Sequence, residues 1–258
     1  MSVIQAALIL GAGAVAGMIN AVAGGGTILT FPALIWMGLL PINANATSTV
    51  ALVPGAMAGA WGYREEMKKS ESWILAMLVP SFAGGLIGGI LLRYTPQQTF
   101  KNLVPFLILF ATFLFIIQGP VQKFLKTRRD EGAGSVSMAS RRWLAYALPV
   151  QFLTGIYGGY FGAGMGIMML ATLSLIGFSN LHQMNGLKNL MGSTINLVAS
   201  AYFVFTGLVS WQPALIMAVG AIIGGYGGAG LAQRLGVKFV RWTVIAIGIG
   251  MSVSLLFK

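Results

Sequence analysis

The chain has 258 residues, of which 57% are hydrophobic and 8% are charged, and it carries a formal net charge of +11. Soluble domains have about 25% charged residues, so this composition excludes a water-exposed globular fold and indicates a protein that lies in lipid. The positive charge is divided among short clusters between apolar runs, as in loops that set membrane topology, which argues against a nucleic-acid partner. Cysteine is absent, which excludes disulfides and thiolate metal sites.

Ten apolar segments follow one another along the chain, and we expect them to form an all-α, polytopic membrane helical bundle. Their ranges are 3–23, 27–40, 44–63, 72–92, 102–118, 143–163, 165–178, 182–206, 210–232 and 241–257. Most reach the ~20 residues that span the hydrocarbon core of a bilayer. Segments 27–40 and 165–178 are shorter, covering about 21 Å as helix. We expect broken, re-entrant or tilted helices there.

Similar features recur in the same order in both halves of the chain, at a nearly constant spacing. Ser72-Trp73 corresponds to Ser210-Trp211, and the glycines at 84–88 correspond to those at 224–228. Internal duplication is common in secondary transporters. We therefore expect two membrane repeats, 1–118 and 143–258, joined by a basic, flexible cytoplasmic linker over 119–142.

Clusters of Lys and Arg at 64–71, 119–142 and 234–241 predict the topology. If all ten segments cross, these clusters share the cytoplasmic side, both termini lie outside and the repeats are inverted. If the two short segments are re-entrant instead, eight segments cross, the repeats are parallel, and the cluster at 234–241 moves outside. The charge bias is then weaker, so we favour inverted repeats and leave the number of crossings between eight and ten.

Glycine-rich runs interrupt the helical pattern at equivalent places in the two halves. The residues expected to form these breaks are Gly24, Gly25, Gly26 and Thr27 in the first half and Gly162, Gly164 and Gly166 in the second. A broken helix can present free backbone N–H groups, together with the positive end of its dipole, to an anion. Close helix packing is the alternative, and we assign that role to the glycines at 84–89 and 220–230.

Lys188 is the one basic residue that we place at membrane depth, and no acidic residue lies inside an apolar segment. A buried ammonium group without a carboxylate partner is unfavourable. It can be deprotonated, extend toward the segment end, or be balanced by a bound anion. Neighbouring polar residues at helical spacing favour the anion: Asn185, Asn189 and Ser193. The missing carboxylates argue against a carboxylate-bound metal site and against a cation substrate, and leave open a Na⁺ site made of carbonyls and hydroxyls.

A second polar cluster, Asn45, Thr47, Ser48 and Thr49, occupies the corresponding segment of the first half. Related by the repeat, the two clusters would meet at one central substrate site. Helix capping is the alternative for Thr47 and Ser48.

The run Gly24–Thr27 with Phe31-Pro32, Gly38 and the cluster 45–49 resembles the TauE/SafE sulfite exporter family, also called the TSUP group. The second copy, from Gly155 through Lys188, resembles the family's second signature. The resemblance implies secondary transport, usually export, of small sulfur-containing anions such as sulfite or organosulfonates, driven by the proton gradient. It also implies eight spanning helices and a multi-pass protein of the bacterial or archaeal inner (plasma) membrane.

The resemblance implies no cofactor, and the partners that we expect are a small anion and the lipid bilayer; homo-oligomerisation stays open. An anion channel and a carrier of non-sulfur organic anions are alternatives. We do not expect an enzyme, because no aspartyl pair, His-Glu-x-x-His motif or Ser-His pairing lies in the membrane segments.

Overall fold

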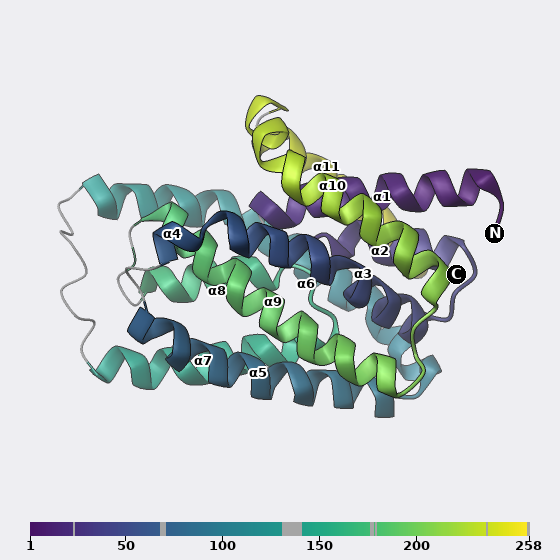
Figure 1. Ribbon diagram of the computed structural model, residues 1–258, viewed down its shortest axis with the longest axis horizontal. Helices are drawn as coiled ribbons and strands as arrows, with labels where there is room; N and C mark the ends of the chain where they lie inside the picture. The colour runs from purple at the N-terminus through teal and green to yellow at the C-terminus, as the bar shows by residue number, and fades with distance from the viewer. Residues whose placement is uncertain are drawn as a thin grey trace.

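The protein is a bundle of helices. The computed structural model describes residues 1–22, 24–67, 71–130, 141–175, 178, 180–235 and 237–256. The helices are α1 (Val3–Val22), α2 (Thr27–Trp36), α3 (Pro41–Gly62), α4 (Arg64–Met67), α5 (Glu71–Tyr94), α6 (Gln97–Asp130), α7 (Arg141–Tyr160), α8 (Met165–Leu175), α9 (Leu181–Phe205), α10 (Trp211–Leu235) and α11 (Val237–Leu256) (Figure 1). These ranges contain no strand, which confirms the predicted all-α class.

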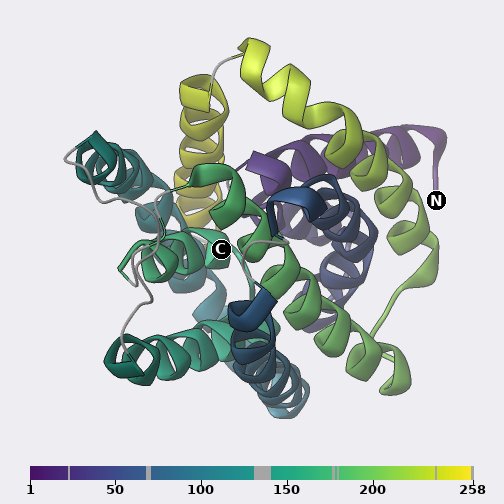
Figure 2. The ribbon, with the colours of Figure 1, turned by 60° about the vertical axis from the view of Figure 1, so that its left-hand side comes forward.

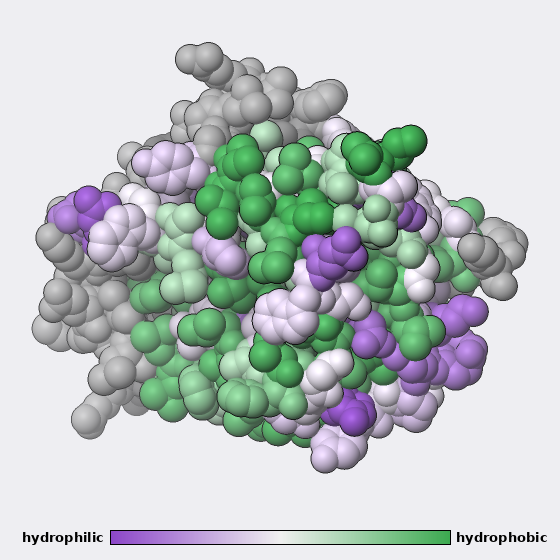
Figure 3. All heavy atoms as spheres, turned by 45° about the vertical axis from the view of Figure 1, so that its right-hand side comes forward, coloured by the Kyte–Doolittle hydropathy of each residue, from purple (hydrophilic) through white to green (hydrophobic). Residues whose placement is uncertain are grey.

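The outer surface of the bundle is suited to lipid. Within the described residues, three spans are long and apolar enough to cross a membrane: Val3–Asn20, Ala76–Tyr94 and Gln97–Ile117. Large apolar side chains point outward, such as Phe113, which is 55% exposed, and apolar groups cover much of the face in Figure 3. Every backbone polar group in lipid must be satisfied within its own segment, which helices achieve. The chain is therefore a multi-pass membrane protein.

The two short segments form short helices, as predicted. α2 has 10 residues and α8 has 11, so each covers about half of the ~30 Å hydrocarbon core. α2 ends earlier than the expected segment because Gly38, with φ +89°, turns the chain just beyond it. These helices therefore begin inside the bundle, at the glycine breaks that precede them.

Glycines bring α1 and α10 into close contact. Gly220 and Gly224 of α10 lie against the backbone of Leu10 and Ala14 in α1, leaving no room for a Cβ atom. Gly17 of α1 lies against α10 in the same way. The contacts advance along both helices together, so α1 and α10 run in the same direction (Figure 2).

α5 and α7 form a second pair of the same kind. Gly84 of α5 lies against Gly155 of α7, and Gly88 lies against Gly159. Small residues let helix backbones approach closely in membranes, where apolar burial between helices adds little. The packing role predicted for the glycines of these two helices, α5 and α10, is confirmed at these positions.

The helix contacts repeat between the two halves of the chain. With the short helices α2 and α8 counted and α4 left out, the first helix of each half packs on the fourth helix of the other half, as α1 does on α10 and α7 on α5. The third helices, α3 and α9, pack on each other, as do the last helices, α6 and α11. Two copies of one unit that exchange partners would produce this pattern. The boundaries and inverted orientation of the repeats stay a prediction.

The segment 119–142 differs from the expected flexible linker. α6 continues to Asp130 and α7 begins at Arg141, while residues 131–140 lie outside the described part of the chain. Residues 121–130 are rich in Lys, Arg, Gln and Leu, which are good helix formers, so the helix extends beyond the apolar run. In Figure 1 the N-terminus lies on the right, opposite α4 and the facing ends of α6 and α7. The last turns of α11 lie on the same side as the N-terminus, because Ser252 donates to the Pro105 carbonyl in the first part of α6. This arrangement favours an odd number of crossings in each half.

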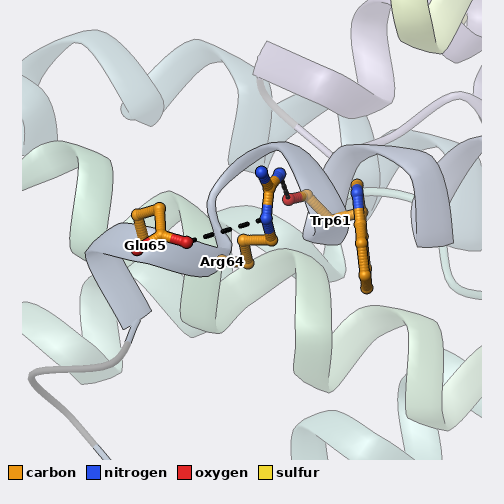
Figure 4. A network of polar contacts seen from close by, with 3 residues as sticks. All are labelled: Trp61, Arg64 and Glu65. Atoms are coloured by element: carbon orange, nitrogen blue, oxygen red, sulfur yellow. Dashed lines mark hydrogen bonds and ion pairs between the residues drawn. The ribbon is translucent and has the colours of Figure 1, made fainter.

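The end of α3 carries an aromatic and charged group typical of a membrane interface. Trp61 is 70% exposed, and the Arg64 guanidinium lies 5.2 Å from the centre of its ring (Figure 4). Arg64 also donates to the Trp61 carbonyl and lies 3.7 Å from Glu65. Tryptophan and arginine anchor helices at the level of lipid headgroups. These residues place the end of α3 near a membrane surface.

Candidate functional site

Two helix breaks lie at the predicted glycine runs. α1 ends at Val22 and α2 begins at Thr27, and α7 ends at Tyr160 and α8 begins at Met165. Within the breaks Gly24, Gly162 and Gly164 have φ values of +70°, +80° and +79°. Residues with a side chain rarely adopt these values, so glycine is required there. The predicted interruption of both helices is confirmed.

The two breaks contact each other across the halves of the chain. A Cβ atom placed on Gly24 would lie 3.0 Å from the Cα atom of Gly166. A Cβ atom on Gly25 would lie 3.5 Å from the backbone nitrogen of Gly164. The first turns of α2 and α8 therefore begin side by side. Each supplies N–H groups that have no carbonyl partner one turn earlier in the same helix.

Some backbone groups of the breaks are already bound within the protein. The N–H groups of Gly25 and Gly26 both donate to Oδ1 of Asn20 in α1, each at 2.8 Å. In the second break, the Tyr157 hydroxyl donates to the Ala163 carbonyl at 2.6 Å. The two breaks are thus held by side chains of the preceding helices.

A cavity of about 40 Å³ opens beside the two breaks. Such a space holds a few waters or an anion of similar size, since one water needs roughly 10–15 Å³. Predicted site residues that line it are Gly24, Gly25, Thr27, Gly162, Gly166, Lys188 and Asn189. Of the described residues that line the cavity, none is acidic.

Lys188 of α9 is the cation of this cavity. Its side chain is 2% exposed, and Nζ has no hydrogen-bond partner among the described residues. The side chain extends toward the first break, since its Cδ lies 3.9 Å from a Cβ position on Gly24. Lys188 therefore turns into the protein and does not extend toward the end of α9. An ammonium group buried in this position without a partner is unfavourable.

Amide groups lie around the ammonium. Asn189 is 7% exposed, and its Nδ2 has no partner in the described part of the chain. Across the cavity it faces α3, where a Cβ on Gly59 would come within 3.2 Å of Nδ2. Asn196, two turns further along α9, and Asn20 of α1 also line the space. The cavity thus combines one cation with several neutral groups able to donate hydrogen bonds.

Comparison with known proteins identifies the family. A sequence profile described as "Sulfite exporter TauE/SafE" matches residues 9–255, nearly the whole chain. The chain belongs to the TauE/SafE family. This TauE/SafE protein is a multi-pass membrane transporter of the plasma membrane, as predicted from its segments and motifs. No solved structure matches it significantly.

Curated relatives of this TauE/SafE protein carry names of the same kind. A "Probable membrane transporter protein" of Haemophilus influenzae (strain ATCC 51907 / DSM 11121 / KW20 / Rd) is 30% identical over 252 residues, covering 97% of this chain and 94% of that protein. "Probable membrane transporter protein YfcA" of Escherichia coli (strain K12) is 28% identical, covering 94% and 86%. "Probable membrane transporter protein YunE" of Bacillus subtilis (strain 168) is 22% identical, covering 92% and 93%.

Other predicted site residues of the TauE/SafE protein do not line the cavity. They are Gly26, Asn45, Thr47, Ser48, Thr49, Gly164, Asn185 and Ser193. Asn45 is fully buried, and its Nδ2 donates to the Tyr160 carbonyl at the end of α7. Thr47 accepts a hydrogen bond from the Ser210 N–H, just before α10. These two side chains satisfy backbone groups at the ends of other helices.

The remaining hydroxyl and glycine positions have internal contacts as well. Ser48 shares a hydrogen bond with Thr30 of α2, and Thr49 donates to the Asn45 carbonyl. Ser193 donates to the Asn189 carbonyl. Gly26 and Gly164 pack against α1 and α6. Asn185 has a buried Oδ1 without a partner among the described residues. Of the two predicted polar clusters, only Lys188 and Asn189 of the α9 cluster therefore line the cavity, and the cluster at 45–49 does not.

Asn20 and Asn196 are cavity residues of the TauE/SafE protein that the sequence did not single out. Asn196 follows Lys188 and Gly192 at four-residue intervals, which places all three on one face of α9. From that spacing, Asn196 could have been predicted to share the cavity with Lys188. Asn20 lies a few residues before the first glycine run, where a side-chain acceptor for the free N–H groups is expected.

Proposed function

We propose that this TauE/SafE protein is a secondary transporter that exports small sulfur-containing anions, such as sulfite or organosulfonates, by alternating access around the cavity at Lys188. Proton coupling belongs to the proposal. The observation that carries it is the buried, unpartnered ammonium of Lys188 in a cavity with no acidic lining residue among those described. A bound anion supplies the missing negative charge.

The energetic argument follows from the cost of a charge at membrane depth. Insertion scales give about 2.5–3.5 kcal/mol for a lysine at the centre of a membrane helix. Nothing in the described structure offsets this cost, because Nζ forms no hydrogen bond there. An anion that pairs with Nζ recovers part of the cost on binding. The contact with Lys188 Nζ therefore stabilises negatively charged ligands and not neutral ones.

The arrangement of donors favours an oxyanion. Lys188 and Asn189 supply N–H donors from α9, and the Thr27 hydroxyl supplies one from α2. We assign a further donor to the Gly166 N–H at the start of α8, which lies 3.5 Å from a Cβ position on Gly24. Several donors converging on one point suit an anion whose charge is spread over several oxygens. The small volume favours sulfite over larger organosulfonates in this conformation.

The proton pathway has three candidates: Lys188, His182 at the start of α9, and the substrate itself. Lys188 lines the cavity, whereas the side chain of His182 lies outside the described part of the structure. A proton carried by Lys188 predicts that a neutral replacement abolishes proton-driven flux, whereas a proton carried by sulfite predicts residual flux that follows the bisulfite concentration.

The test is a thermal-shift screen of detergent-purified protein with sulfite, sulfate, organosulfonates and carboxylates. Stabilisation by sulfite and small sulfonates, and not by carboxylates of equal charge, supports the substrate class. Stabilisation by carboxylates alone would instead support the alternative function, a carrier of non-sulfur organic anions.

The second alternative is an anion channel, which would share the positive site. Counterflow of labelled sulfite in proteoliposomes separates the two. A carrier accelerates uptake of label when unlabelled substrate is present inside, whereas a channel shows flux without this exchange.

A further inference from the structure

Asn20 occupies an unusual place between the cavity and the first helix break. It lies near the end of α1 and lines the same cavity as Lys188. Its Oδ1 accepts hydrogen bonds from the N–H groups of both Gly25 and Gly26, each at 2.8 Å. One oxygen therefore fills the position at the start of α2 that an anionic oxygen would take.

This oxygen is neutral, while its surroundings favour a negative one. The two N–H groups belong to the positive end of the α2 dipole. Lys188, 2% exposed and without a partner for Nζ among the described residues, points into the same space. A carboxamide oxygen satisfies the N–H groups and leaves the ammonium unneutralised. An oxyanion could satisfy both with two of its oxygens.

We propose that Asn20 is a displaceable internal ligand, which holds the Gly25 and Gly26 N–H groups in the empty site and yields them to one oxygen of the bound oxyanion while another oxygen meets Lys188. The inference rests on the proposed transport of small anions and names the residue with which the substrate competes.

The exchange has a use in a transport cycle. An unpaired backbone N–H buried away from water is unfavourable, so an empty carrier with free N–H groups would be held back when it changes conformation. The Asn20 carboxamide satisfies these groups when no substrate is present. The substrate must then displace it, so the apparent affinity is the intrinsic affinity multiplied by the fraction of time that the N–H groups are free.

The test compares Asn20→Ala and Asn20→Asp with wild type, by thermal shift and by direct binding of labelled sulfite. Asn20→Ala removes the competitor, and we expect sulfite to bind about three- to tenfold more tightly. Asn20→Asp places a carboxylate on the same N–H groups beside Lys188, and we expect the stabilisation by sulfite to be lost. Asn43→Ala is the matched control: its Nδ2 donates to the Leu208 carbonyl, away from the cavity, and sulfite affinity should stay at the wild-type value.

An ordinary helix cap predicts different results. If Asn20 only caps α2, Asn20→Ala lowers stability with unchanged or weaker sulfite binding. A sulfite response that is kept in Asn20→Asp would likewise show that an oxygen on the Gly25 and Gly26 N–H groups does not compete with the anion. Either result overturns the proposal, and Asn20→Ala decides alone if the Asp variant does not fold. Wild-type protein that shows no response to any anion overturns the transport proposal as well. A wild-type response that depends on Lys188 but not on Asn20 overturns this inference alone.

Discussion

Replacing Lys188 by methionine should make the empty protein more stable and remove anion binding. Methionine keeps the length and most of the apolar volume of the side chain but has no charge. Lys188 Nζ is buried without a partner among the described residues, so the wild-type protein bears the cost of this charge when no ligand is bound. The functional group is therefore a destabilising one.

The magnitude follows from the same cost. Taking about 2 kcal/mol of the 2.5–3.5 kcal/mol insertion penalty as recoverable gives a rise in Tm of about 4–8 °C for a chain of this size. Sulfite at about 100 times its Kd should stabilise the wild-type protein by roughly 2.7 kcal/mol and leave Lys188→Met unchanged. With sulfite present, the two proteins should unfold at similar temperatures.

The assay is thermal unfolding in detergent, with and without sulfite, for wild type, Lys188→Met and Lys101→Met. Lys101 of α6 is exposed, so its replacement tests the loss of a lysine outside the cavity and should leave the sulfite response intact. An Lys188→Met protein that is less stable than wild type without anion would refute the reasoning, because the ammonium would then make a favourable contact. A full sulfite response in Lys188→Met would refute Lys188 as a ligand.

Glycine substitutions test the helix break at Gly24 and the close packing of α10 on α1. Gly24→Ala should lower stability by about 1–2 kcal/mol through its positive φ and should also abolish sulfite transport, because its Cβ would lie 3.0 Å from the Gly166 Cα at the cavity. Gly38→Ala has the same backbone cost in open space, so it should lose similar stability in unfolding assays but still transport. Gly224→Ala should sharply reduce the yield of folded protein in size-exclusion chromatography, since its Cβ would overlap the α1 backbone. Gly250→Ala, in open space, should not; equal yields would refute the packing role.

The features that could be predicted from the sequence involve residues that are energetically unfavourable inside an ordinary membrane helix. Consecutive glycines are poor helix interior, so the breaks at 24–26 and 162–164 could be expected. A lysine in an apolar segment is unfavourable unless it has a function, so Lys188 could be singled out. Both conclusions depend on one segment at a time, which is why a single sequence sufficed for them.

The features that could not be predicted depend on which helices meet. Asn45 and Thr47 look like site residues in the sequence, but they satisfy backbone groups of Tyr160 and Ser210, more than a hundred residues away. Asn20 reaches the cavity because the break turns α2 back beside α1. Polar side chains of these types cap helices as readily as they bind ligands, so their roles depend on tertiary contacts.

The pairing of α1 with α10 has a consequence for biosynthesis. Gly13 of α1 packs against Met217, so its partner emerges from the ribosome about 200 residues later, or roughly 10–40 seconds at ordinary rates of translation. Through that interval the first helix sits in the bilayer with its glycine face uncovered. A chain truncated before α10 lacks the surface that receives α1. Newly made N-terminal fragments should therefore depend on the insertion machinery or on quality-control proteases until the last helices arrive.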